Sequence, residues 1–241
     1  MWNYFEPEEA RWYHWNLNGA AFYLRRDGNE WRAVVNSIVL PEATPLAGGP
    51  GTDPPPKELP GYFIAASNRK VILRPYFYEK PYYINFREKI CLMPEAETRL
   101  NLALPPVLRL EAGELELIRF TPFLLSEAWT GDNPMSGSLC VSLPMGSPSS
   151  EFKEVSSFIH GELILRNPTK TVLAIDHLVL YTNSLNIYEK EGRLLCETAM
   201  VDTNGGEPRV NFLQGVPGGY GTITSAKKTG WGISLSAGIW I

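Results

Sequence analysis

Residues 158–181, FIHGELILRNPTKTVLAIDHLVLY, hold the pattern that decides the fold. Two apolar runs, 158–165 and 171–181, are rich in isoleucine, valine and leucine, and their lengths suit strands better than helices. Between them, Asn167-Pro168-Thr169 has the composition of a turn, because asparagine and proline favour chain reversal. This stretch therefore predicts two strands joined as a β-hairpin.

Four more pairs of apolar runs have a similar arrangement around a glycine-containing turn. One pair, 107–110 and 114–120, flanks Ala112-Gly113, and its apolar residues change phase between Leu117 and Ile118. A phase change of this kind predicts a β-bulge. The other three predicted hairpins join 21–24 to 31–35, 185–188 to 194–196, and 199–201 to 210–212.

Glycine and proline are too frequent for long helices. The chain has 241 residues, of which 21 are glycine and 20 are proline, more than an average protein contains. Only three short segments, 6–12, 123–129 and 150–156, allow a helix, and none has a convincing length. We therefore predict an all-β protein, an antiparallel β-sandwich built as two packed, sandwich-like lobes.

The most distinct break in the chain is residues 41–60, half of which are proline or glycine. Because proline cannot donate to a strand ladder, this composition predicts a long surface connection or a partly disordered loop. We expect an N-terminal lobe, 1–125, that contains this loop, and a C-terminal lobe, 126–241.

Charge and hydropathy exclude two classes of partner. The formal net charge is −4 and no basic run is longer than Lys227-Lys228, so the chain lacks the basic surface that binds nucleic acid. No apolar stretch approaches the roughly 18 residues of a membrane helix, and residues 1–9 do not resemble a signal peptide. We therefore expect no nucleic acid, no membrane span and a cytoplasmic location.

The three cysteines, Cys91, Cys140 and Cys196, have neither metal-binding nor disulfide spacing. Each lies among apolar neighbours. We predict that all three are reduced and buried, as small apolar side chains in a reducing compartment.

Aromatic residues are the most prominent candidates for a ligand or partner surface. They are dense around two segments, and the side chains we select are Tyr76, Tyr78, Tyr82, Tyr83, Trp12 and Trp15. One interpretation is a stacking platform for sugar rings or a contact surface for another protein. The other is that aromatics are preferred strand residues covered on both faces of a sheet. Because neighbouring strand residues point to opposite faces, each adjacent pair must place one ring outside the local core.

Known catalytic and metal-binding motifs are missing from the sequence. The three histidines have no spacing that suggests a metal site, so we expect no metal and no cofactor. His177 adjoins Asp176, but alternation along a strand predicts opposite directions for the two side chains. Glu114 and Glu116 share a predicted strand face, although alternating glutamates are more typical of a solvated surface. The catalytic residues, if any, are unknown.

Five segments follow one another in a recognisable order: Thr121-Pro122-Phe123, 136–140, 161–167, 175–180 and 185–188. This order resembles a prokaryotic protein family, domain of unknown function 432, over about residues 115–201. The resemblance implies a β-rich prokaryotic protein. The family carries no assigned activity, so no catalytic residues can be transferred to this chain.

These observations favour a non-catalytic module for binding or assembly, because enzyme motifs are missing and aromatic strands are plentiful. The alternative is a carbohydrate-active enzyme or a sugar-binding protein, since aromatic and carboxylate residues in such proteins leave no local signature.

The last eleven residues predict self-association, because 231–241 is apolar and carries no charged side chain. We expect a homo-oligomer whose interface includes Trp231, Ile233, Leu235 and Trp240. The alternative is that this segment is the final core strand of the C-terminal lobe.

Overall fold

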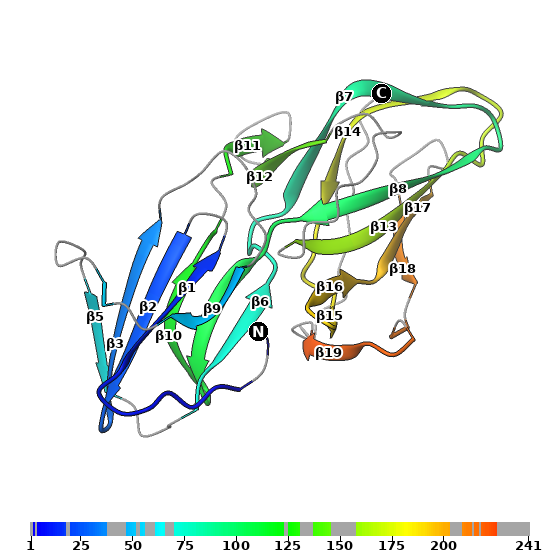
Figure 1. Ribbon diagram of the computed structural model, residues 1–241. Coiled ribbons are helices and arrows are strands. Elements are labelled where there is room, and N and C mark those ends of the chain that lie inside the picture. The colour runs from blue at the N-terminus through cyan, green and yellow to red at the C-terminus, as the bar shows by residue number, and fades with distance from the viewer. Residues whose placement is uncertain are drawn as a thin grey trace.

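All regular structure in the computed structural model is β-strand (Figure 1). The residues described are 2, 4–17, 20–37, 47–51, 54–55, 61–65, 70–122, 125–130, 137–145, 158–202, 209–213, 215–216 and 218–225. None of these residues is helical, which confirms the all-β prediction. No helix in this part of the chain is therefore long and apolar enough to cross a membrane.

The short helical alternatives are not realised where the structure describes them. Residues 6–11 precede the first strand without helical turns, and 127–130 form a strand. The segment 150–156 lies outside the described residues.

Sheet 1 has the strand order β4-β1-β2-β3-β5. The predicted hairpin around Asp27-Gly28 is confirmed as β2–β3, and Gly28 has the positive φ of 63° that such a turn needs. β4 lies within the predicted loop 41–60 and pairs with β1, so this segment contains a strand. The strands of sheet 1 are β1 Trp12–Leu17, β2 Ala20–Asp27, β3 Glu30–Ser37, β4 Ala47–Gly51 and β5 Gly61–Ala65.

Sheet 2 has the order β10-β9-β6 and packs face to face with sheet 1. The rings of Phe22 and Phe120 meet between the two sheets with centroids 5.3 Å apart. The pairing of β9 with β10 shifts register between Glu116 and Ile118, which confirms the predicted bulge. The strands of sheet 2 are β6 Ile72–Tyr76, β9 Val107–Ala112 and β10 Leu115–Phe120.

Sheet 3 has the order β11-β12-β7-β14 and is mixed, because β7 runs parallel to β12 and antiparallel to β14. The expectation of an antiparallel sandwich therefore holds only in part. Its strands are β7 Tyr82–Leu92, β11 Glu127–Thr130, β12 Ser138–Met145 and β14 Leu173–Leu180.

Sheet 4 has the order β18-β17-β13-β16-β15-β19, and β8 pairs with β13 beside this path. β13 runs parallel to both β16 and β17, so this sheet is also mixed. The hairpins β15–β16 and β17–β18 confirm two of the predictions. The strands are β8 Glu97–Leu104, β13 Ile159–Arg166, β15 Ile187–Lys190, β16 Arg193–Cys196, β17 Thr198–Asp202, β18 Arg209–Leu213 and β19 Gly221–Thr224.

The hairpin predicted over 158–181 is wrong, although both of its strands exist. β13 pairs with β8 in sheet 4, and β14 pairs with β7 in sheet 3. The turn between them crosses from one sheet to the other, held by the buried amide of Asn167. Its Nδ2 donates to the carbonyl oxygens of Leu92 at 3.0 Å and Thr171 at 2.8 Å. This side chain ties the turn to the end of β7, so each strand pairs with a partner far away in the sequence.

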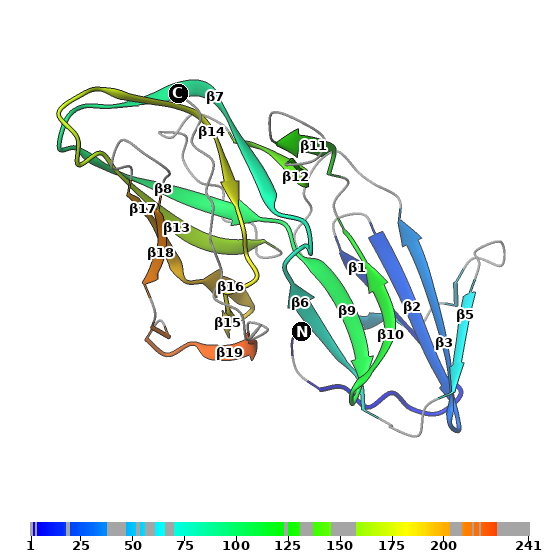
Figure 2. The same ribbon diagram turned by 180° about the vertical axis from the view of Figure 1, so that it is seen from behind.

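The sheets form two groups that lie side by side (Figure 1, Figure 2). Sheets 1 and 2 make the first group, and sheets 3 and 4 make the second. The chain enters the second group with β7 and β8 and returns to the first with β9 and β10, so strand pairing does not separate at residue 125. The division into domains 1–125 and 126–241 stays a prediction.

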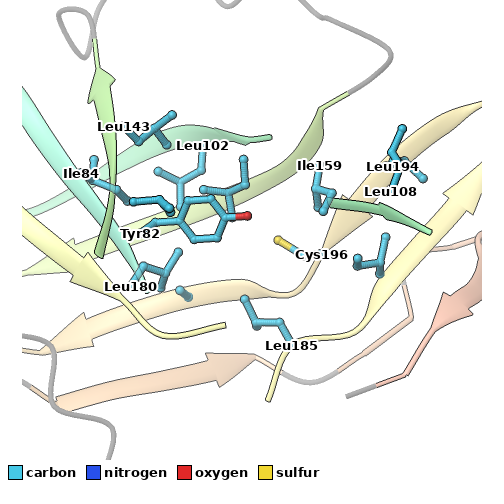
Figure 3. Packing of buried hydrophobic residues seen from close by; sticks show 14 of the residues in the cluster. Tyr82, Ile84, Leu102, Leu108, Leu143, Ile159, Leu180, Leu185, Leu194 and Cys196 are labelled. Carbon is cyan, nitrogen blue, oxygen red and sulfur yellow. The ribbon is translucent and has the colours of Figure 1, made fainter. Parts of the chain in front are cut away.

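A buried hydrogen bond joins the two places at which the chain passes from one group of strands to the other. Tyr82, which begins β7, donates from its hydroxyl to the carbonyl oxygen of Pro105 at 2.8 Å, just after β8 ends. Tyr82 is fully buried, with its ring among apolar side chains that include Ile84 and Leu180 (Figure 3). One cluster of buried residues spans both groups of strands, so the crossings lie inside a shared core.

Two of the three cysteines are buried as predicted, and one is not. Cys140 and Cys196 are buried, and burial raises the pKa of Cys196 to about 12. Gly161 leaves room for this thiol, because a Cβ there would lie 2.7 Å from its Sγ. Cys91 is exposed, which corrects the prediction. It alternates with Ile90 and Leu92, which face the core, so its own side chain points to solvent.

We predict that Tyr82→Phe lowers the free energy of unfolding by about 1–3 kcal/mol, because it leaves the buried carbonyl of Pro105 without its donor. Denaturant unfolding measures the change. Tyr83→Phe, which removes a hydroxyl from the neighbouring position on the opposite face of β7, is the matched control and should change stability by less than about 0.5 kcal/mol. Equal losses in the two variants would contradict the structural role of this bond.

Candidate functional site

A hollow of about 320 Å³ opens where the two groups of strands meet. Its wall combines the β6–β7 connection with side chains of sheet 2 and of the β11–β12 pair. Charged and hydroxyl-bearing side chains make up part of it: Tyr78, Glu79, Lys80, Arg109, Arg119, Thr121 and Glu127. The hollow therefore combines charged groups with apolar side chains such as Val107 and Val141, and it is formed by residues from both sides of the crossing.

Three arginines form a row across the outer face of sheet 2. Arg109 on β9 is the direct cross-strand partner of Arg74 on β6 and of Arg119 on β10. Neighbouring strands lie about 4.8 Å apart, so the three cations start from closely spaced backbone positions. Like charges in direct register repel each other, and such a row requires compensating anions.

Two carboxylates form ion pairs with the arginines of this row. Glu111 Oε2 lies 3.1 Å from Arg74 Nε. Glu116 receives two hydrogen bonds from Arg119, at 3.0 and 3.1 Å, which is the paired geometry that suits a guanidinium. Both carboxylates belong to the strands of the sheet, so the fold fixes their positions.

The bulge in β10 makes the pairing of Glu116 with Arg119 possible. In a regular strand, residues three apart point to opposite faces. Here the register shifts between Glu116 and Ile118, and both Leu117 and Ile118 are buried. The bulge therefore returns Arg119 to the face of Glu116. The sequence predicted the bulge, but not the ion pair that it forms.

A third carboxylate reaches the row from outside the sheet. Glu79, in the β6–β7 connection, places Oε1 2.8 Å from Arg119 Nη1 and 3.6 Å from Arg109 Nη2. Its side chain is 72% exposed, whereas that of Arg109 is only 14% exposed. The same connection supplies Lys80, which forms an ion pair with Glu127 of β11. The connection thus contributes one anion and one cation to the hollow.

Two of the aromatic candidates belong to this region. The guanidinium carbon of Arg109 lies 4.1 Å from the centroid of the Tyr76 ring, a cation–π contact that holds the arginine in place. The Tyr76 hydroxyl donates to Glu111 at 2.6 Å. Burial is the main cause that raises the pKa of both Tyr76 and Tyr78 to about 12. Both phenols are therefore protonated at neutral pH.

The other aromatic candidates lie elsewhere. Tyr82 is in the core, and Trp15 packs flat on the core residue Phe22, with centroids 4.5 Å apart. Trp12 is half-buried, 6.0 Å from the guanidinium of Arg25. The structure therefore does not bring the six aromatic side chains together. The predicted interface residues Trp231, Ile233, Leu235 and Trp240 lie outside the described residues.

Tyr83 takes part in a separate cluster on the outer face of sheet 3. Its ring stacks on His177 with centroids 5.0 Å apart, and His177 Nδ1 lies 2.5 Å from Asp176 Oδ1. This contact corrects the expectation that His177 and Asp176 point apart. The register of β14 shifts between Ile175 and His177, so alternation is broken there as well. The hollow lies on the opposite face of sheet 3, because its lining residue Val141 is in register with the inward-facing Tyr82.

Sequence reasoning missed one exposed aromatic residue near the hollow. Trp129 is 50% exposed, and Leu139, its cross-strand partner, is 38% exposed. Both lie on the strand face that also carries Glu127 and Val141, which line the hollow. An isolated tryptophan in a short segment gave no periodic signal in the sequence. Its pairing with Leu139 becomes visible only once β11 is aligned with β12.

The fold and the site together define a sandwich-like, all-β protein with a charged hollow at the junction of its two groups of strands. The chain belongs to the family described as "Protein of unknown function (DUF432)", whose model matches residues 1–229. This match confirms the resemblance noted in the sequence and extends it well beyond residues 115–201. No curated protein and no solved structure matches the chain.

The raised pKa of Tyr78 predicts a loss of stability at high pH. A phenol whose pKa is about 12 in the folded protein and about 10 in the unfolded chain stabilises the fold fully below pH 10. This contribution is lost as the pH rises from about 10 to about 12. We therefore expect a smaller alkaline loss of stability in Tyr78→Phe than in the wild type. Denaturant midpoints across this pH range measure it, and identical pH profiles would contradict the prediction.

Proposed function

We propose that this protein is a non-catalytic binding module and that the hollow is its ligand site. The row of Arg74, Arg109 and Arg119 beside the hollow is the observation that carries the proposal. A fold that needs only stability gains little from cations in direct register, whereas arginines held at fixed spacing are well suited to recognising a polar ligand.

The chemistry around the hollow favours a saccharide as the ligand. Charged side chains and the Tyr78 phenol offer hydrogen bonds to hydroxyl groups. Trp129 and Leu139, on the same strand face, offer an apolar surface to one side of a sugar ring. The strands place Trp129 about 7 Å beyond Glu127, so a ligand of more than one ring can reach both parts.

A carbohydrate-active enzyme is the second candidate, because two carboxylates, Glu79 and Glu127, line the same hollow. Each is paired with a cation, Glu79 with Arg119 and Glu127 with Lys80. This pairing supports a binding role for both carboxylates. The saccharide experiment below also detects turnover.

We further propose that the protein is prokaryotic, resides in the cytoplasm and forms a homo-oligomer. The resemblance to a prokaryotic family supports a prokaryotic origin. The free thiols of Cys91, Cys140 and Cys196 support a reducing compartment. Self-association is supported by the uncharged, apolar sequence of residues 231–241.

The saccharide proposal predicts that Trp129→Ala weakens binding about tenfold, because a stacked ring is lost. Titration of the labelled protein with cellohexaose, xylohexaose and oligogalacturonate, followed by NMR, measures the affinity. Tyr4→Ala, which removes another well-exposed aromatic ring, is the matched control and should bind as the wild type does.

Two results would contradict this proposal. One is that none of the three oligosaccharides shifts the amide signals of β9–β12. The other is that Trp129→Ala and Tyr4→Ala bind equally well. Release of shorter sugars during the titration would establish the enzyme instead.

A further inference from the structure

We propose that Glu79 occupies the position of an acidic group of the ligand, so that the hollow selects acidic saccharides, such as those that contain uronic acids. This inference rests on the proposed function and specifies its ligand. The Glu79 carboxylate contacts both Arg109 and Arg119. A ligand carboxylate would take its place.

Charge on the sheet itself supports this assignment. The strands of sheet 2 bring three cations into the row but only two carboxylates that contact it, Glu111 and Glu116. The row therefore has one uncompensated positive charge. Glu79 supplies the missing anion from a connecting segment, where its position is not fixed by strand pairing.

The fold holds Arg109 and Arg119 more firmly than it holds Glu79, the carboxylate that contacts both. Arg109 is mostly buried, stacks on the Tyr76 ring and lies 3.4 Å from Glu116. Arg119 is held by the two hydrogen bonds to Glu116. Glu79 is 72% exposed, and exposed ion pairs contribute little to stability. Arg109 and Arg119 are thus preorganised to bind an anion, and the Glu79 carboxylate that contacts them is easily displaced.

The geometry of the contact matches the recognition of a carboxylate. One oxygen of Glu79 faces both guanidinium groups, at 2.8 and 3.6 Å. Guanidinium groups pair well with carboxylate and with phosphate. The Trp129 and Leu139 surface favours an acidic saccharide over phosphate, because a saccharide of more than one ring can reach this surface and inorganic phosphate cannot.

Three variants test the displacement. Glu79→Gln removes the competing charge, and Arg119→Gln removes one of the two cations. Glu114→Gln, at the β9–β10 turn, changes the net charge of the protein in the same way as Glu79→Gln and is the matched control. Far-ultraviolet circular dichroism confirms that each variant is folded.

The measurement is an NMR titration of the full chain with D-glucuronate, D-glucose and inorganic phosphate. We expect Glu79→Gln to bind glucuronate about three- to tenfold more tightly than the wild type, since the displaced ion pair is exposed. Arg119→Gln should bind it more weakly, and Glu114→Gln should equal the wild type. Glucose affinity should be the same in Glu114→Gln as in the wild type, and added salt should weaken only the binding of anions.

Equal glucuronate affinity in Glu79→Gln and Glu114→Gln would overturn the inference. Phosphate binding as tight as that of oligogalacturonate would overturn the choice of an acidic saccharide. If cellohexaose binds through Trp129 while Glu79→Gln and Glu114→Gln bind glucuronate equally well, only this inference fails and the binding module stands. If glucuronate behaves as expected while Trp129→Ala has no effect, the extended saccharide site fails and the acidic pocket stands.

Discussion

The buried hydrogen bond from Tyr82 to the carbonyl oxygen of Pro105 joins the two places where the chain crosses between its groups of strands. Between these residues, β7 and β8 pair with strands that come much later in the sequence. Sheets 3 and 4 are therefore each built from a strand that lies between the two crossings and from strands that come later in the chain. The hollow lies beside them, with Tyr78, Glu79 and Lys80 on the entering segment and Val107 and Arg109 on the returning one. The site is thus a consequence of the crossing.

Alternation along a strand is the second constraint, and the described part of the chain departs from it at places that matter for chemistry. A bulge in β10 places Glu116 and Arg119 on one face, where they form a paired contact. Where β14 pairs with β7, the register shifts between Ile175 and His177, and Asp176 contacts His177 there. In both places, a break in the regular register lets two side chains meet that regular geometry would separate. Bulges are common beside functional sites for this reason.

Much of the local structure was predictable from the sequence, because turns and apolar periods are local properties. The hairpins β2–β3, β9–β10, β15–β16 and β17–β18 formed where glycine-containing turns separated apolar runs. Non-local pairing was not predictable. Asn167-Pro168-Thr169 has the composition of a hairpin turn, yet its strands pair elsewhere, and the Asn167 amide donates to Leu92 at the end of β7. The arginine row was not predictable either. Arg74 and Arg109 are neighbours in sheet 2, but β7 and β8, which belong to other sheets, separate them in the sequence.

The most direct test of the proposed ligand site is a crystal structure of the protein grown with an oligogalacturonate. The account predicts a carboxylate of the sugar between Arg109 and Arg119, with Glu79 turned away and a sugar ring against Trp129. The Glu116–Arg119 contact should remain as it is in the free protein, because the bulge fixes it. A structure in which the sugar binds elsewhere, or in which Glu79 still bridges the two arginines beside the bound sugar, would contradict the account.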